Sequence, residues 1–178
     1  MKLKPYDLIL IALFAALIAL CAWLTIPAAV PFTMQTFGLF LALLLLGGRR
    51  GVLCVTVYLL LGAAGAPVFS GFRGGVSALA GVTGGYLAGF LVSALLMWAL
   101  SGFARKGRAA LAVSMALSLA ACYAFGTAWF VAVSAREGAA ASFRTALAVC
   151  VLPYLLPDAA KLYLAFLLAR RLKRFMKP

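Results

Sequence analysis

A carboxylate and an ammonium lie in the middle of an apolar segment that runs from about residue 146 to residue 169. Asp158 and Lys161 are three residues apart, so on a helix they share one face, and Tyr154 extends that face by one turn. If the segment crosses a bilayer, a rise of about 1.5 Å per residue places Asp158 near the middle of a hydrocarbon core about 30 Å thick. A charge at that depth costs about 2.5–3.5 kcal/mol, so the pair predicts a functional site; the alternative is a structural ion pair between helices.

Two prolines precede the pair. Pro153 and Pro157 lack the N–H that a helix interior needs, so we expect a kink just before the charged residues. The carbonyls of Val149 and Pro153 would then lose their helical donors and become extra acceptors. The segment is therefore expected to line a cavity with both charges and free backbone oxygens.

The composition is that of a polytopic membrane protein. Of 178 residues, 67% are hydrophobic and 11% are charged, and the mean hydropathy is +1.15. The net charge of +13 comes from short basic groups at the ends of apolar spans, so membrane orientation explains it and a nucleic-acid partner is not expected. There is no histidine, which excludes histidine-based catalysis, and the four dispersed cysteines indicate no disulfide or metal site.

The apolar pattern predicts an all-α fold with six transmembrane helices in a single integral membrane domain covering residues 1–178. The first span is expected to be a retained helix and not a signal peptide, because it is about 19 residues long. Twelve lysines and arginines fall on the side of the termini and three on the other, so both termini are expected to be cytoplasmic. The expected spans are about 8–26, 34–47, 52–65, 81–101, 110–133 and 146–169.

The second and third spans are short for a crossing and are flanked by glycines. Such segments are tolerated in a membrane only where they are buried in protein or line a cavity, and Gln35 would point into that cavity. The glycine-rich stretch 65–77 that follows is either a plain connection or a lid over the site. Gly81, Gly85 and Gly89 then form a row that predicts close packing against another helix, and no phosphate-binding loop for ATP occurs.

Four stretches together resemble a known family. They are VPFTMQTF (30–37), GAPVFSGFRGG (65–75), TGGYLAGF (83–90) and DAAK (158–161). In this order, on a six-span chain, they resemble the BioY family of biotin transporters, which are the substrate-binding S components of energy-coupling factor (ECF) transporters. One position departs from the family pattern, because Val82 stands where a proline usually precedes Thr-Gly-Gly-Tyr.

The resemblance implies biotin as the transported ligand, bound from outside, with no cofactor and no metal. It implies that Asp158 and Lys161 bind biotin: Asp158 would accept from a ureido N–H, and Lys161 would donate to the ureido carbonyl or pair with Asp158. Aromatic side chains, among them Phe69, would cover the ring, and polar ones would meet the remaining groups. The expected binding residues are Phe32, Gln35, Phe72, Arg73, Ser77, Tyr86, Tyr154, Asp158 and Lys161.

The resemblance also implies partners. A transmembrane T protein and two ATPase subunits would energise transport, and the loaded chain would reorient in the lipid of a bacterial cell membrane. By similarity to other S components, small-residue pairs in the first span would dock the T protein; they are Ala12 with Ala16 and Ala15 with Ala19.

Four other functions make different demands on the sequence. A structural or assembly membrane protein would use the Asp158–Lys161 pair only to hold helices together, and it would leave the glycine-rich stretch and the short second and third spans unexplained. An S component for another small vitamin would share the architecture. An ion-coupled carrier would use Asp158 as its relay and would show pH-dependent uptake without an ATPase. An intramembrane aspartyl enzyme would need a second deep carboxylate, but Asp7 lies at the membrane edge and Glu137 in a loop, so an enzyme is not expected.

Overall fold

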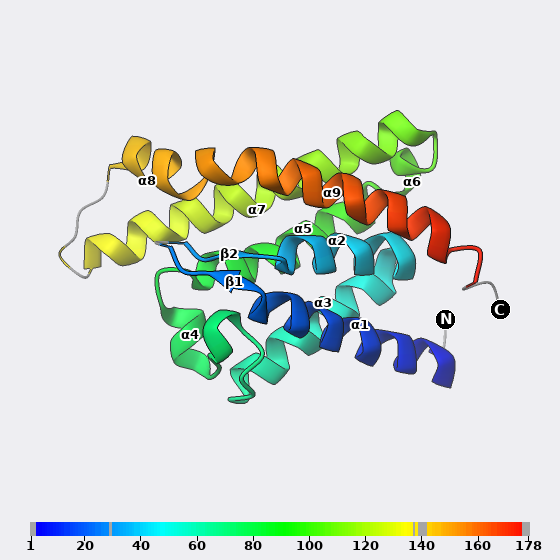
Figure 1. Ribbon diagram of the computed structural model, residues 1–178, viewed down its shortest axis with the longest axis horizontal. Helices are drawn as coiled ribbons and strands as arrows, with labels where there is room; N and C mark the ends of the chain where they lie inside the picture. Colours follow the sequence, from blue (N-terminus) through cyan, green and yellow to red (C-terminus); the bar gives the residue numbers. More distant parts are fainter. Residues whose placement is uncertain (1–2, 29, 137, 139–141, 176–178) are drawn as a thin grey trace.

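The computed structural model describes residues 3–28, 30–136, 138 and 142–175, and these form an elongated helical bundle (Figure 1). Glu137 lies outside the described residues. The elements are α1 (Pro5–Trp23), β1 (Thr25–Ile26), β2 (Phe32–Thr33), α2 (Gln35–Leu46), α3 (Gly48–Ala63), η1 (Ser70–Phe72), α4 (Val76–Ala80), α5 (Gly84–Ala99), α6 (Ser101–Ala104), α7 (Arg108–Arg136), α8 (Phe143–Cys150) and α9 (Leu152–Leu172).

Helix α2 is the centre of the bundle. It packs against α1, α3 and α9, and ten of its twelve residues are buried, so it has almost no surface left for lipid. Its length of 12 residues is consistent with the short second span expected from the sequence. A helix this short is stable here because protein surrounds it on most sides.

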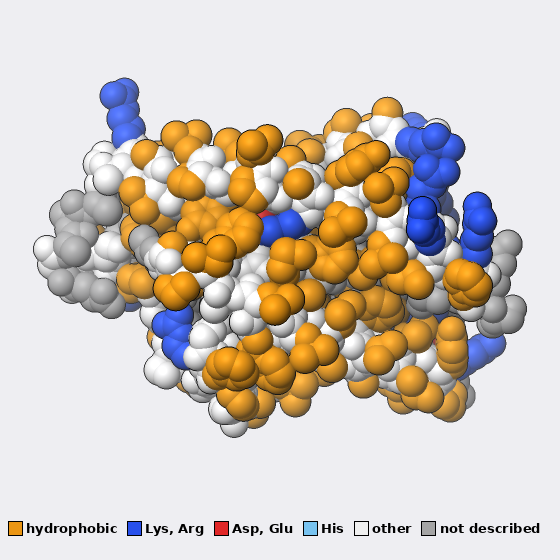
Figure 2. Space-filling view, in the orientation of Figure 1, with side chains coloured by type: hydrophobic (Ala, Val, Ile, Leu, Met, Phe, Trp, Pro, Cys, Tyr) orange, Lys and Arg blue, Asp and Glu red, His pale blue; other side chains and the backbone are white. Residues whose placement is uncertain are grey.

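Within the part of the chain that the structure describes, α1, α7 and α9 are long and apolar enough to cross a membrane, while α2 and α5 are shorter apolar helices. Helix α1 begins and α9 ends at the same end of the bundle (Figure 1), and Lys and Arg side chains gather there while hydrophobic side chains cover most of the visible face (Figure 2). This arrangement is compatible with six spans and two cytoplasmic termini, which stay predictions.

The last predicted span is two helices. Helix α8 ends at Cys150 and α9 begins at Leu152, with Val151 between them in a non-helical conformation (φ −123°, ψ −55°). The interruption therefore precedes Pro153, which lies in the first turn of α9, where a missing N–H costs nothing. Pro157 is inside α9, and the helix continues through it to the charged pair.

The glycine row brings α5 against α7. A Cβ added at Gly85 would lie 2.2 Å from Cβ of Trp129, and one added at Gly89 would lie 2.9 Å from Sγ of Cys122. The predicted close packing is confirmed at these two glycines. Gly81 precedes α5 and instead accepts a hydrogen bond through its carbonyl from Nε1 of Trp129, at 3.0 Å.

The alanine pairs of α1 face opposite ways. Ala12 and Ala16 are exposed, whereas Ala15 and Ala19 are 2% and 6% exposed and belong to the hydrophobic core. The expectation that both pairs dock a partner is therefore wrong for Ala15 and Ala19. Those two side chains are already used to pack α1 against the rest of the bundle.

Candidate functional site

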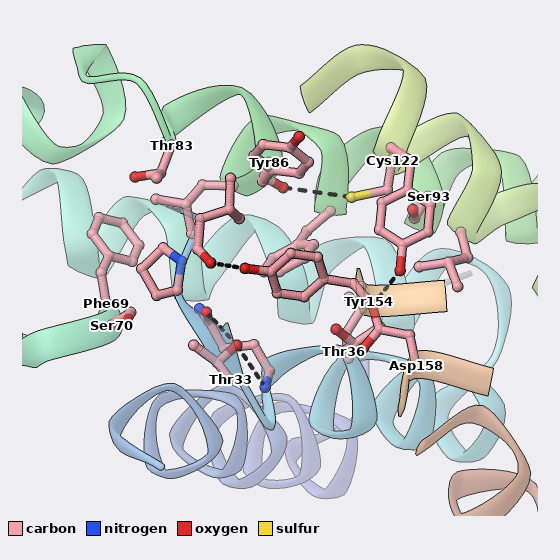
Figure 3. A pocket seen from close by; sticks show the side chains of 18 of the residues that line it. Thr33, Thr36, Phe69, Ser70, Thr83, Tyr86, Ser93, Cys122, Tyr154 and Asp158 are labelled. Atoms are coloured by element: carbon pink, nitrogen blue, oxygen red, sulfur yellow. Dashed lines mark hydrogen bonds between the residues drawn. The ribbon is translucent and has the colours of Figure 1, made fainter. Parts of the chain in front are cut away.

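A cavity with a volume of about 90 Å³ lies among α2, α5, α7, α9 and the segments that precede α2 and α4 (Figure 3). Its walls are largely apolar, with polar groups placed at a few points, as in small-molecule sites. The residues that line it include Pro31, Thr33, Gln35, Leu39, Phe69, Ser70, Arg73, Thr83, Tyr86, Phe90, Ser93, Cys122, Tyr123, Tyr154, Asp158 and Lys161.

The charged pair of α9 lies in one wall of this cavity. Nζ of Lys161 donates to Oδ1 of Asp158 at 2.7 Å, and the two residues are only 6% and 4% exposed. The same ammonium donates to the carbonyl of Thr33 at 2.7 Å and lies 3.8 Å from the ring centroid of Phe32. Lys161 therefore connects α9 to β2, the strand that precedes α2.

The short hairpin of β1 and β2 positions Phe32 and Thr33 for their contacts with Lys161. Its strands are antiparallel, with Ile26 opposite Phe32, and they hold Phe32 and Thr33 against α9. Tyr154 adds two contacts one turn before the pair: its O–H donates to the carbonyl of Val30, and its ring stacks on Phe32 with centroids 6.2 Å apart. The connection between α1 and α2 is thus fixed along α9.

A second partner of Asp158 comes from α7. The O–H of Tyr123 donates to Oδ2 of Asp158 at 2.5 Å, so each carboxylate oxygen has one donor. Both oxygens retain lone pairs, because a carboxylate offers about four acceptor positions. The carboxylate is therefore held in place and can still accept a hydrogen bond from a ligand.

Gln35 is buried in an adjacent polar network. Its Nε2 donates to Oη of Tyr58 at 2.7 Å, and its Oε1 accepts from Oγ1 of Thr33 at 3.0 Å. The O–H of Tyr58 donates in turn to the carbonyl of Val68 at 3.1 Å. These bonds fix the start of α2 and connect it to the glycine-rich loop.

The loop 65–75 covers one side of the cavity. Phe69 is 2% exposed and meets Tyr58 edge to face, while Ser70 and Arg73 line the cavity beside it. Trp23, at the end of α1, donates from Nε1 to the carbonyl of Pro67 at 2.8 Å. These contacts favour the lid interpretation over that of a plain connection.

The opposite wall is built from α5 and α7. The hydroxyls of Tyr86 and Thr127 are hydrogen-bonded at 3.1 Å, and the thiol of Cys122 donates to the carbonyl of Tyr86 at 3.7 Å. Gly126 makes this approach feasible, since a Cβ there would lie 2.3 Å from the Tyr86 ring. The ring of Tyr86 therefore forms a fixed surface of the cavity.

Six of the nine expected binding residues line the cavity: Gln35, Arg73, Tyr86, Tyr154, Asp158 and Lys161. Phe32 lies just behind the pair, where its ring contacts Lys161. Two others lie elsewhere. Phe72 is 63% exposed and stacks on Trp23 with centroids 5.0 Å apart, and Ser77 is exposed on α4. Phe72 adopts a positive φ of 57°, and its side chain lies on Trp23, whereas the next residue, Arg73, lines the cavity.

Sequence reasoning missed Tyr123 and Thr33. Tyr123 is an aromatic residue in a long apolar span, where lipid-facing and cavity-facing positions have the same local pattern. Thr33 contributes through its backbone carbonyl, which no side-chain pattern reveals. The polar residues Ser114, Ser118 and Thr127, all buried on α7, are a signal that could have pointed to an inward face on that helix.

The solved structures include a close match to this fold. The crystal structure of the S component for biotin from an ECF-type ABC transporter superposes with a TM-score of 0.81, at 24% identity, and covers 97% of this chain and 95% of its own. This chain therefore has the helical fold of that structure.

The family model described as the BioY family matches residues 1–178. A biotin transporter BioY of Thermotoga maritima is 40% identical over 94% of this chain and 96% of its own length. A probable biotin transporter BioY of Pyrococcus horikoshii is 35% identical over 96% and 98%. The chain belongs to the BioY family and is a membrane protein.

Proposed function

We propose that this chain is the substrate-binding subunit of a biotin transporter and that it binds biotin in the cavity beside α9. The observation that carries the proposal is the buried Asp158–Lys161 pair in a largely apolar cavity. Two full-length relatives named biotin transporter and probable biotin transporter support the ligand. The chain is accordingly a transport protein and not an enzyme.

The chemistry of biotin matches the polar groups of the cavity. Its ureido ring has two N–H donors and one carbonyl acceptor, and its bicycle and tail are apolar up to a terminal carboxylate. Asp158 accepts a ureido N–H, and the rings of Phe69, Tyr86 and Tyr154 supply apolar surface for the bicycle. The cavity thus combines an acceptor for the ureido head with walls that exclude water.

Charge balance sets the orientation of the ligand. Asp158 and Lys161 neutralise each other at 2.7 Å, whereas Arg73 has no carboxylate partner among the cavity-lining residues that the structure describes. An anionic ligand therefore places its carboxylate toward Arg73 on the loop and its neutral ureido head toward Asp158.

Transport requires partners. We propose that an ECF T protein docks on the exposed face of α1 through Ala12 and Ala16, where small side chains allow a partner helix to approach closely. Two ATPase subunits supply the energy, and the loaded chain reorients in the lipid that surrounds exposed side chains such as Leu13 and Leu156. The loop 65–75 covers biotin during this step.

The test is uptake of labelled biotin by cells that lack their own biotin transporter. We expect uptake when the chain is expressed with a T protein and active ATPases, and loss of uptake when the ATPases are inactivated. Uptake that follows the proton gradient and needs no ATPase would favour an ion-coupled carrier instead. Uptake of another vitamin in place of biotin would overturn the ligand assignment.

A further inference from the structure

The ammonium of Lys161 is already occupied by the protein. An ammonium has three N–H donors, and those of Lys161 face Oδ1 of Asp158 at 2.7 Å, the carbonyl of Thr33 at 2.7 Å and the ring of Phe32 at 3.8 Å. A ligand that reaches the pair therefore finds the acceptor positions of Asp158 more open than the donors of Lys161. The geometry of that carboxylate then decides which ligand head groups fit.

Tyr123 fixes the carboxylate from a different helix. Its O–H, donated to Oδ2 of Asp158 at 2.5 Å, takes one of the acceptor positions on that oxygen. Its own position is set by α7 and not by α9, because the neighbouring Cys122 is held against α5, with Gly89 making room for its thiol. The hydroxyl of Tyr123 thus has a fixed position on α7, and its hydrogen bond holds the carboxylate of Asp158 in one orientation.

We propose that Tyr123 is a positioning and specificity residue, which orients Asp158 to accept a single N–H from a neutral ureido head and disfavours head groups that need both carboxylate oxygens. The inference rests on the proposed biotin-binding function. A guanidinium prefers a two-pronged contact with both oxygens of a carboxylate. With Oδ1 accepting from Lys161 and Oδ2 accepting from Tyr123, each oxygen has one acceptor position fewer for that two-pronged contact, whereas one ureido N–H needs a free lone pair on only one oxygen.

The matched probe is 2-iminobiotin, in which a guanidine replaces the urea while the bicycle, tail and carboxylate stay the same. At a pH where the guanidinium is protonated, binding of biotin and of 2-iminobiotin is measured on the parent, on Tyr123→Phe and on Tyr163→Phe. The phenylalanine keeps the packed ring and removes only the O–H. Tyr163 lies on α9 and is 64% exposed, so its variant is the control.

Tyr123→Phe should bind biotin about tenfold more weakly, because it loses a hydrogen bond to a charged group that orients the acceptor. The ratio of the two dissociation constants should shift about tenfold in favour of 2-iminobiotin, while Tyr163→Phe matches the parent. Both ligands are titrated on the same preparation, so the ratio does not depend on how much of the variant is folded. An unchanged ratio, whether both affinities stay or fall together, would overturn the proposal. A folded parent that binds no biotin would instead refute the proposed function.

Discussion

Removing Lys161 should destabilise the protein more than neutralising Asp158. In Lys161→Met the carboxylate of Asp158, 4% exposed, keeps only the O–H of Tyr123, and breaking a buried pair in this way costs about 3–5 kcal/mol. In Asp158→Asn the ammonium keeps the carbonyl of Thr33 and the ring of Phe32, so we expect a loss of about 1–3 kcal/mol.

The double variant Asp158→Asn/Lys161→Met tests the same reasoning through its stability relative to Lys161→Met. It leaves no uncompensated charge in the cavity wall, so it should be more stable than Lys161→Met although it carries one more substitution. The coupling between the two substitutions must then exceed the loss expected for Asp158→Asn alone, about 1–3 kcal/mol. Only a tightly paired, buried ion pair produces this reversal, because two independent substitutions would add their losses.

The assay is thermal unfolding of the purified protein in detergent without biotin. One kcal/mol corresponds to about 2–4 °C for a chain of this size, so Lys161→Met should unfold about 6–20 °C below the parent. Lys173→Met, which removes an exposed lysine near the end of α9, serves as the control and should stay close to the parent. A Lys161→Met variant as stable as this control, or a double variant that shows the summed loss, would refute the reasoning.

Two further predictions concern helix packing and ligand orientation. Gly85→Ala should lower the free energy of unfolding by about 1–3 kcal/mol, because the new Cβ would lie 2.2 Å from Cβ of Trp129. Gly102→Ala is the control and should leave stability unchanged, since a Cβ at that position has no atom within 4 Å. Thermal unfolding of both variants measures the difference, and equal stability would contradict the packing of α5 on α7. Arg73→Gln should weaken binding of biotin about tenfold but leave binding of biotinamide, which lacks the carboxylate, nearly unchanged. An equal loss of affinity for both ligands in a titration would show that Arg73 does not contact the carboxylate.

Those parts of the site that lie on one segment could be predicted from the sequence. Asp158, Lys161 and Tyr154 share a helical face, so their spacing alone indicated a common cavity, and all three line it. Gln35 stood out as a polar residue at the start of a short apolar span, and the structure buries it in the same region. Local periodicity carries this kind of information because it depends only on the geometry of one helix.

Contacts between distant segments could not be predicted in this way. Tyr123 meets Asp158 across 35 residues of sequence, and Lys161 meets the carbonyl of Thr33 across 128. The alanine pairs of α1 could not be assigned for the same reason. Their four-residue spacing places the two pairs on two faces of the helix, but it does not indicate which face packs against the rest of the protein. Phe72 was misjudged for a related reason: its side chain follows a loop whose sharp turn depends on a positive φ.

The most direct test of the account is equilibrium binding of labelled biotin to the purified protein, measured on the parent, Asp158→Asn, Lys161→Met and the control Lys173→Met at a temperature where all four are folded. We expect the parent and the control to bind equally well and the two pair variants to bind at least about tenfold more weakly. A folded parent that does not bind biotin, or pair variants that bind as well as the parent, would contradict the assignment of this cavity as the biotin site.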